Sequence, residues 1–304
     1  MVDFKDRVAV ITGAGGGLGR EHALLLAGLG AAVVVNDLGG SVDGTGAASS
    51  AADAVVAEIV AAGGAAVAEY SSVATPDGGA AIVRKALDEF GRLDVVINNA
   101  GILRDKSFAN MEEDQVTAVL DVHLRGAFWV TRAAWPHMRE QSYGRVLMTS
   151  SASGAMGNFG QSNYGAAKMG LIGLMNVLKL EGAKYNIKVN AIAPIAVTRM
   201  TEELLGSFGI TADQFGPQAV SPAVAYLTSE SCDLTGEIWS VGGGSVSRIF
   251  VGLTDGFFKH PTNDGQLATE DVVENLELIR DTANYLIPAS NQDEFQKLGA
   301  KLLA

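Results

Sequence analysis

The feature that most constrains the fold is an apolar run near the start of the chain that leads directly into glycines. Residues 7–19, RVAVITGAGGGLG, predict a strand followed by a tight turn, and residues 17–29 have the apolar spacing of a helix. Glycines allow a close approach of the backbone, so a pyrophosphate can lie against the first N–H groups of such a helix. We therefore predict that Gly13, Gly17 and Gly19 hold a dinucleotide; taken alone, they also fit a glycine-rich loop without a ligand.

An acid follows at the place where a dinucleotide site needs one. The next apolar run, AAVVVND, ends in Asp37, about 20 residues after the glycines, where a carboxylate can accept hydrogen bonds from an adenosine ribose. Asp37 would repel a 2′-phosphate, and Leu38, next in the chain, offers no cation to offset this. The order of strand, glycine turn, helix, strand and acid thus predicts NAD as the cofactor.

A second group of residues suits proton transfer. Tyr164 and Lys168 share one face of a predicted helix, and Ser151 ends the apolar run RVLMTSS before a glycine-rich bend that could return it to that face. A free tyrosine has a pKa of about 10, and a cation one turn away favours its phenolate. A nearby hydroxyl could hold a substrate oxygen. Taken alone, the pair could also be an ordinary helix that carries a tyrosine and a lysine.

Apolar strands and helical stretches alternate along the chain, which is typical of an α/β fold with a doubly wound parallel sheet. Strands are expected at about 7–12, 32–37, 65–70, 93–98, 144–150, 187–193 and 237–241, with helices near 17–29, 48–62, 78–90, 111–139 and 162–184. We expect one Rossmann-like domain over residues 1–245. Residues 246–304 are expected to form an ordered C-terminal extension, because their apolar content is high for a disordered tail.

Three motifs together resemble the short-chain dehydrogenase/reductase family. They are T-G-x-x-x-G-x-G at residues 12–19, N-N-A-G at residues 98–101, and the set Ser151, Tyr164 and Lys168. The resemblance covers roughly residues 4–245. Within the family the chain is most similar to the (3R)-hydroxyacyl-CoA dehydrogenase units of peroxisomal multifunctional enzymes, over the stretches 33–40, 98–108, 122–138 and 151–168.

The resemblance implies roles for particular residues. Ser151 would hold the alcohol or carbonyl oxygen, Tyr164 would take the proton, and Lys168 would lower the pKa of the tyrosine and bond the nicotinamide ribose. Asn99 would lie along the same ribose. The remaining cofactor contacts that the resemblance implies are Leu18, Ser72, Val73, Ala196 and Thr198, and the cofactor would be NAD.

The chain departs from the broad family at three points. His123 stands where many members have asparagine in V-N-x-x-G, and it could act in its place or be a satisfied core histidine. Ile195 follows Pro194 where many members of the family have a glycine, and the hydroxyacyl-CoA subfamily that the chain resembles also lacks this glycine. Ser71-Ser72-Val73 replaces an acid that often faces adenine, so the adenine contact would come through the backbone.

The resemblance implies oxidation of (3R)-3-hydroxyacyl-CoA to 3-oxoacyl-CoA, or the reverse reaction. Alternatives are a 17β-hydroxysteroid or other lipid alcohol, 3-oxoacyl carrier-protein reduction, and a catalytically silent NAD-binding scaffold, which would not need the Ser-Tyr-Lys set. No stretch resembles a hydratase, so a hydratase step is expected from another protein. The helices near 111–139 and 162–184 hold more apolar residues than one buried face needs, which predicts a homodimer, or a tetramer built from such dimers.

Composition excludes some classes of partner. A formal charge of −12 without a basic stripe disfavours nucleic acid and anionic membrane surfaces. No apolar stretch reaches the roughly 18 residues of a membrane span, no N-terminal signal is evident, and AKLLA does not match a peroxisomal address. Cys232, the single cysteine, fits a reducing compartment and a buried thiol. We expect a cytoplasmic protein without a metal site.

Overall fold

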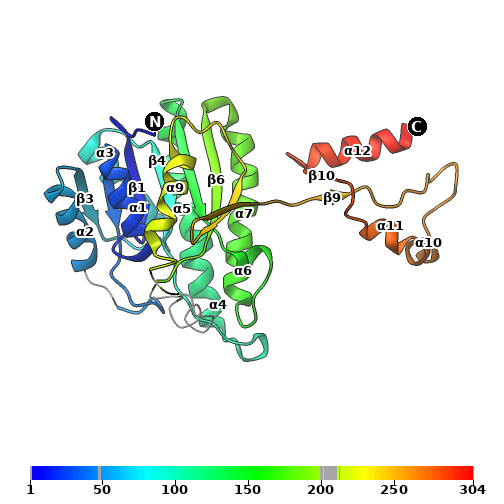
Figure 1. The fold of residues 1–304 in the computed structure, drawn as a ribbon, viewed down its shortest axis with the longest axis horizontal. Helices are drawn as coiled ribbons and strands as arrows, with labels where there is room; N and C mark the ends of the chain where they lie inside the picture. Colours follow the sequence, from blue (N-terminus) through cyan, green and yellow to red (C-terminus); the bar gives the residue numbers. More distant parts are fainter. Residues whose placement is uncertain (1, 47–48, 199–200, 202–210, 212, 304) are drawn as a thin grey trace. The chain divides into compact units, whose positions relative to one another are not determined.

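The computed structural model describes the chain apart from residues 1, 47–48, 199–200, 202–210, 212 and 304. The start of the helix expected at residue 48 therefore lies outside the described residues. The chain divides into two compact units, Met1–Ile249 and Phe250–Ala304. Figure 1 colours the chain from its N-terminus to its C-terminus and labels the elements of both units.

The first unit is built on one sheet with the strand order β3-β2-β1-β4-β5-β6-β7-β8. Its described strands are β1 Val8–Thr12, β2 Ala32–Asn36, β3 Ala65–Glu69, β4 Val95–Asn98, β5 Gly144–Thr149, β6 Ile187–Pro194, β7 Ile238–Gly242 and β8 Ser245–Ile249. Strands β1 to β7 pair in parallel, and β8 runs antiparallel to β7. The order reverses at β1, which lies between β2 and β4, so the sheet has the switch point at which doubly wound folds bind ligands.

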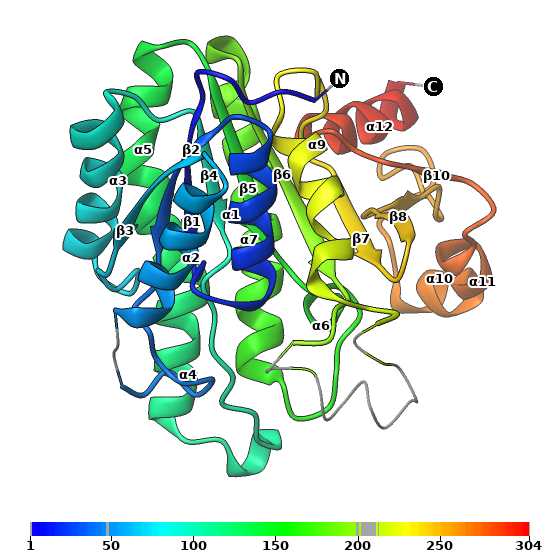
Figure 2. The same cartoon turned by 60° about the vertical axis from the view of Figure 1, so that its left-hand side comes forward.

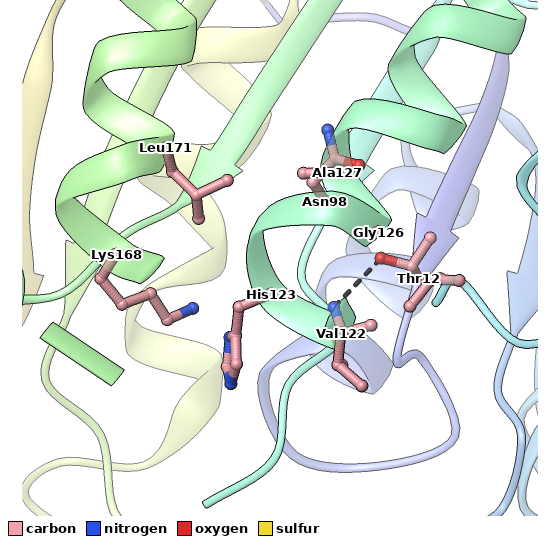
Figure 3. Close-up of a pocket in the computed structure, with 10 residues that line it drawn as sticks. Thr12, Asn98, Val122, His123, Gly126, Ala127, Lys168 and Leu171 are labelled. Atoms are coloured by element: carbon pink, nitrogen blue, oxygen red, sulfur yellow. Dashed lines mark hydrogen bonds between the residues drawn. The ribbon is translucent and has the colours of Figure 1, made fainter. Parts of the chain in front are cut away.

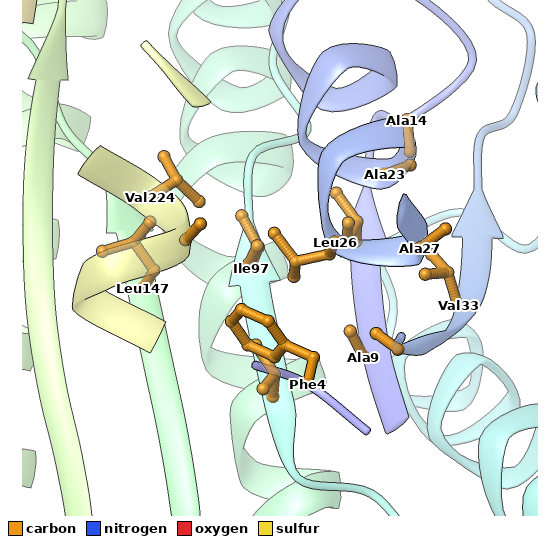
Figure 4. Close-up of a cluster of buried hydrophobic side chains, with 14 of the residues drawn as sticks. Phe4, Ala9, Ala14, Ala23, Leu26, Ala27, Val33, Ile97, Leu147 and Val224 are labelled. Carbon is orange, nitrogen blue, oxygen red and sulfur yellow. The ribbon is translucent and has the colours of Figure 1, made fainter. Parts of the chain in front are cut away.

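Helices cover both faces of this sheet (Figure 2). One face packs against α1 Gly17–Gly28, α2 Ser50–Ala61 and α9 Ser221–Thr228, and the other against α3 Pro76–Phe90, α5 Gly126–Glu140 and α7 Ser162–Gly182. Because both faces are covered, the central strands are buried along their whole length. Figure 4 shows one core cluster, in which Leu26 of α1 and Val224 of α9 meet Ile97 of β4.

The predicted α/β architecture is confirmed, with differences at three elements. The single helix expected over residues 111–139 consists of α4 Glu113–Leu120, a π-helical turn Asp121–Arg125 and α5. Helix α9 was not predicted. Strand β8 was placed in the extension, but it hydrogen bonds along β7 and so belongs to the first unit, which ends at Ile249.

The second unit, Phe250–Ala304, contains α10 Thr269–Glu274, α11 Leu276–Arg280, α12 Asn291–Leu303 and a short antiparallel pair, β9 Leu253–Thr254 with β10 Tyr285–Leu286. The Phe250 and Tyr285 rings stack with centroids 5.4 Å apart, and Lys259 pairs with Asp271 at 2.6 Å. Among the described helices of the chain, none is both long and apolar enough to cross a bilayer.

Candidate active site

The glycine turn after β1 is shaped by close backbone contacts. Gly13 and Gly17 have φ angles of +64° and +52°, which only glycine adopts without strain. A Cβ at Gly13 would lie 2.8 Å from Cα of Ala100, and one at Gly19 would lie 2.3 Å from the carbonyl oxygen of Gly13. These glycines therefore let the turn pack closely against the end of β4 and the start of α1, which is the backbone arrangement that a pyrophosphate site at a helix N-terminus needs.

Asp37 lies directly against this turn. Its Oδ2 accepts a hydrogen bond from the Gly15 nitrogen at 2.7 Å, and its Oδ1 accepts one from the Gly39 nitrogen at 2.7 Å. No lysine or arginine of the described chain pairs with this carboxylate. An acceptor without a neighbouring cation suits a ribose hydroxyl better than a ribose phosphate.

Asn99 joins the end of β4 to the glycine turn. Its amide donates to the carbonyl oxygens of Thr12 and Gly13 at 2.9 and 3.0 Å. The Thr12 hydroxyl in turn accepts from the backbone nitrogens of Asn99 and Ala100, both at 3.0 Å. The ends of β1 and β4 are thus fixed to one another. Thr12, the first residue of the T-G-x-x-x-G-x-G motif, is a positioning residue, a role that the motif alone did not indicate.

The other predicted cofactor residues lie in segments around this floor. Thr198 comes close to the turn, because a Cβ at Gly17 would lie 3.7 Å from its Cγ2. Val73 and Ala196 are buried, whereas Leu18 and Ser72 are half-buried. Val73 also packs against Gly126, where a Cβ would lie 2.9 Å from its Cγ2. The described geometry is compatible with cofactor contacts from these residues, which stay predictions.

Ser151, Tyr164 and Lys168 are brought together as predicted from their spacing. Ser151 follows β5 and caps α6 Ala152–Ala155, where its hydroxyl accepts from the Ser153 nitrogen at 3.1 Å. Tyr164 and Lys168 lie in the first turns of α7, with the lysine Nζ 5.3 Å from the centre of the tyrosine ring. Helix α6 packs on α7 at Gly154, where a Cβ would lie 2.9 Å from Cβ of Lys168.

Burial governs the charge state of this set. Lys168 is 3% exposed and donates to the carbonyl oxygen of Thr149 at 2.5 Å, and burial lowers its pKa to about 7. Burial also raises the pKa of Tyr164, while interaction with the Ser151 hydroxyl acts in the opposite direction. Desolvation is the largest of these influences, because burial disfavours the charged phenolate. The lowering of the tyrosine pKa by Lys168, which the resemblance implies, stays a prediction.

His123 lies beside the catalytic tyrosine in the π-helical turn. Its ring meets that of Tyr164 edge-on, with centroids 5.1 Å apart and planes at 86°. Its Nε2 lies 3.0 Å from the nitrogen and 2.8 Å from the oxygen of Ile102. Its Nδ1 is buried and has no hydrogen-bond partner in the described part of the chain.

Asn163 is a further positioning residue that sequence reasoning missed. Its buried amide donates to the carbonyl oxygens of Arg104 and Gln115 at 3.0 and 3.1 Å, and its Oδ1 accepts from the Tyr164 nitrogen at 2.7 Å. The start of α7 is therefore fixed to the loop after β4 and to α4. The only signal in the sequence was a polar residue directly before the tyrosine, which is too common to indicate such contacts.

The predicted burial of Cys232 is confirmed, since the residue is fully buried and burial raises the pKa of its thiol. A protonated, inaccessible thiol is a poor nucleophile.

Comparison with known proteins agrees with the fold and the motifs. The short chain dehydrogenase family matches residues 7–206. A protein of Mycobacterium tuberculosis that bears a short-chain dehydrogenase/reductase name is 58% identical over 264 residues, which are 86% of this chain and 92% of that protein. Peroxisomal multifunctional enzyme type 2 of Mus musculus is 50% identical over 95% of this chain, but this chain spans only 39% of the mouse enzyme.

Solved structures give the same assignment. The full-length peroxisomal multifunctional enzyme type 2 of Drosophila melanogaster superposes with a TM-score of 0.81 at 39% identity, covering 99% of this chain and 50% of that chain. A short chain dehydrogenase of Mycobacterium avium superposes with a TM-score of 0.76 at 41% identity, covering 92% of this chain and 98% of that one. The predicted resemblance to the family and to the multifunctional enzymes is confirmed. This chain belongs to the short-chain dehydrogenase/reductase family and is an oxidoreductase that acts on a CH–OH group.

Proposed function

We propose that the protein interconverts (3R)-3-hydroxyacyl-CoA and 3-oxoacyl-CoA with NAD as its cofactor. The observation that carries the cofactor is the Asp37 carboxylate, which lies against the glycine turn with no cation of the described chain beside it. The substrate class is supported by the names of relatives, among them the mouse multifunctional enzyme and a hydroxyacyl-CoA dehydrogenase of Mycobacterium tuberculosis that is 38% identical over 81% of this chain.

Ser151, Tyr164 and Lys168 each have a separate role in the proposed reaction. The hydroxyl of Ser151 orients the substrate oxygen, and the phenolate of Tyr164 takes the hydroxyl proton as the alcohol becomes a carbonyl. The ammonium of Lys168, placed over the tyrosine ring, favours that phenolate and can donate to the ribose. A nicotinamide held at the predicted cofactor residues would supply the acceptor for the hydride of the alcohol carbon. In the reducing direction Tyr164 returns the proton.

A substrate panel tests this proposal. (3R)- and (3S)-hydroxyacyl-CoA esters of C4 to C16 and estradiol would be assayed, each with NAD and with NADP. We expect the highest kcat/KM for a (3R)-thioester with NAD. Preference for the (3S)-esters, or for estradiol, would contradict the proposed substrate, but it would still agree with an oxidoreductase that acts on a CH–OH group.

A carrier-protein substrate is the second candidate. A 3-oxoacyl-[acyl-carrier-protein] reductase of Synechocystis is 40% identical over 81% of this chain and 99% of its own length. Measuring kcat/KM for 3-oxoacyl groups on the carrier protein and on CoA, each with NADH and with NADPH, distinguishes the carrier-protein substrate from the CoA substrate. Higher kcat/KM for the carrier-protein ester would favour this alternative.

We infer further that two chains pair through α5 and α7. Apolar side chains of these helices stay exposed in the single chain, among them Phe128, Met169, Val177 and Leu180. An isologous contact would bury them and rigidify the helix of Tyr164 and Lys168. Light scattering with size exclusion should give two or four chain masses at micromolar concentration. Val177→Glu should lower this mass, whereas Val60→Glu on α2 is the matched control, and a mass of one chain for the wild type rejects the pairing.

A further inference from the structure

The strand ends beside Asp37 carry a buried side-chain pair, Asn36 and Glu69. Asn36 is the last residue of β2 and Glu69 the last residue of β3, and they are only 2% and 9% exposed. The amide of Asn36 donates to Oε2 of Glu69 at 2.7 Å. Within the described ranges, no lysine, arginine or histidine forms an ion pair with this carboxylate.

The pair is not needed to hold the two strands together. Strands β2 and β3 already pair in parallel from Ala32 opposite Ala65 to Asn36 opposite Glu69. A buried carboxylate without a cation costs free energy that a neutral side chain at the same place would not cost. The contacts that distinguish Glu69 therefore lie beyond the strand ends, in the backbone that follows β3.

Both backbone groups of Ser71 are bonded to this pair. The Ser71 nitrogen donates to Oε1 of Glu69 at 3.0 Å, and the Ser71 oxygen accepts from the amide of Asn36 at 3.0 Å. Since a peptide group with both neighbours bonded to buried side chains cannot turn without breaking a hydrogen bond, the chain leaves β3 in one direction.

The next two residues are held by helices. A Cβ at Gly78, in the first turn of α3, would lie 1.9 Å from the oxygen of Ser72, so this turn lies directly against the segment. Val73 is buried, and with Gly126 and Ala127 of α5 it helps to line the small cavity that Figure 3 shows, whose volume is about 10 Å³. Residues 71–73 are thus fixed by the side-chain pair, by α3 and by α5.

The same pair is joined to Asp37. Asn36 directly precedes it, and the Asp37 nitrogen donates to the backbone oxygen of Glu69 at 3.0 Å. The pair therefore lies between the carboxylate that is predicted to hold a ribose and the residues that are predicted to face the adenine, Ser72 and Val73. A site whose parts are already in place binds more tightly, because no segment has to be ordered when the ligand arrives.

We propose that Asn36 and Glu69 are positioning residues for the adenosine half of the cofactor. Their hydrogen bonds hold the backbone of residues 71–73 at a fixed spacing from Asp37, so that the ribose and adenine contacts are available together. This inference rests on the proposed dinucleotide cofactor and is independent of the substrate.

Asn36→Ala and Glu69→Ala each break the pair, and their effect can be measured without any reaction. The dissociation constant of ADP-ribose, determined by calorimetry, should rise about tenfold in each variant. In the double variant it should rise no more than about twofold beyond either single variant, since both changes break the same bonds. Losses that multiply to about a hundredfold, or an unchanged dissociation constant in either single variant, overturn the proposal.

Glu69→Gln tests whether the hydrogen bond or the charge matters. It removes the charge and keeps an oxygen that can accept from the Ser71 nitrogen, with nearly the same volume. The dissociation constant of ADP-ribose should therefore rise less than in Glu69→Ala. An equal rise in the two variants overturns the proposal.

Asn190→Ala is the matched control for a merely structural role. Asn190 is a buried residue of β6, a strand that is not adjacent to β2 or β3, and its amide donates to the Leu234 oxygen at 2.9 Å while its Oδ1 accepts from the Glu237 nitrogen at 3.0 Å. Its loss should lower the free energy of unfolding in urea, as the loss of Asn36 does, and leave the dissociation constant of ADP-ribose within about twofold. A rise as large as in Asn36→Ala would show that binding follows stability alone, and this overturns the proposal.

A second ligand separates this inference from the choice of cofactor. Each dissociation constant would also be measured for ADP-ribose that carries a 2′-phosphate. Tighter binding of the phosphorylated ligand to the wild type would contradict NAD, but the comparison between variants holds for either ligand, because both contain the same adenosine. If the wild type binds neither ligand, the proposal is overturned.

Discussion

Oδ2 of Asp37 accepts a hydrogen bond of 2.7 Å from the backbone nitrogen of Gly15. A Cβ at position 15 would lie 2.8 Å from the same oxygen, so the acid after β2 and the turn after β1 meet without space for a side chain between them. The two segments of the predicted cofactor site therefore form one surface, and a change at Asp37 alters both the charge and the shape of that surface.

Variants of Asp37 should separate charge from shape. Asp37→Asn keeps an oxygen that can accept from Gly15 and removes the charge, whereas Asp37→Ala removes both. If repulsion of a 2′-phosphate sets cofactor choice, both variants should narrow the ratio of kcat/KM for NAD over NADP by at least about fivefold, since a close charge pair shifts binding by about 1 kcal/mol or more. Comparable kcat/KM for the two cofactors in the wild type would contradict the expected preference.

Tyr164→Phe should remove the proton acceptor and leave the ring in place. Proton transfer by a positioned group contributes about 10²–10⁴-fold, so we expect kcat to fall by at least that order. The dissociation constant of NAD, followed by fluorescence, should change little. Tyr185→Phe, in the 3-10 turn Ala183–Tyr185 that follows α7, is the matched control. Turnover near the wild-type value in Tyr164→Phe would assign the chemistry to another residue.

The parts of the fold that are set by local sequence could be predicted. Apolar runs with glycines and helical spacing placed β1, α1 and β2, because their patterns span only a few residues each. The relation of Tyr164 to Lys168 followed in the same way from one turn of helix. The position of Asp37 beside the glycine turn was predictable because its strand ends at a typical interval after the glycines.

The parts that depend on distant contacts could not be predicted. The hydrogen bond of His123 to Ile102, and its contact with Tyr164, join three segments, so the residue alone gave two open interpretations. Strand β8 was missed because its side chains are mostly exposed and it is defined by pairing with β7. Helix α9 is short, and it is buried on α1 rather than marked by a polar face.

Gly101→Ala should act through His123. The added Cβ would lie 2.3 Å from Cε1 of the ring, and such crowding in a packed core costs about 1–3 kcal/mol. We expect a lower free energy of unfolding and a lower kcat. Adding His123→Asn, a smaller side chain, should recover part of the lost stability, giving a coupling energy of about 0.5–3 kcal/mol in the double-mutant cycle.

The matched control for this cycle is Gly28→Ala at the end of α1, where no atom lies within 4 Å of an added Cβ. It should be neutral or slightly stabilising, since alanine favours a helix more than glycine does. Strictly additive losses for Gly101→Ala and His123→Asn, measured by urea unfolding, would show that the two positions do not interact.

The stability of the protein should fall in mild acid because of His22. Its ring is fully buried between α1 and α9, where Nδ1 lies 2.8 Å from Oγ of Ser221, and burial lowers its pKa from 6.5 to about 3. Below pH 6.5 the unfolded chain takes up a proton that the folded chain excludes, so stability is lost as the pH falls. The slope approaches about 1.4 kcal/mol per pH unit for this one group.

Two variants test whether His22 causes this dependence of the free energy of unfolding on pH. His22→Asn keeps an amide near the position of Nδ1 and no longer titrates, so it should flatten the dependence of the free energy of unfolding on pH between 5 and 7. Ser221→Ala removes the hydrogen bond and leaves the imidazole, so it should lower stability across this range while the slope stays. His123, whose pKa burial also lowers, accounts for part of the slope that remains in His22→Asn. Urea unfolding at each pH measures both effects, and an unchanged slope in His22→Asn would show that the proton is taken up elsewhere.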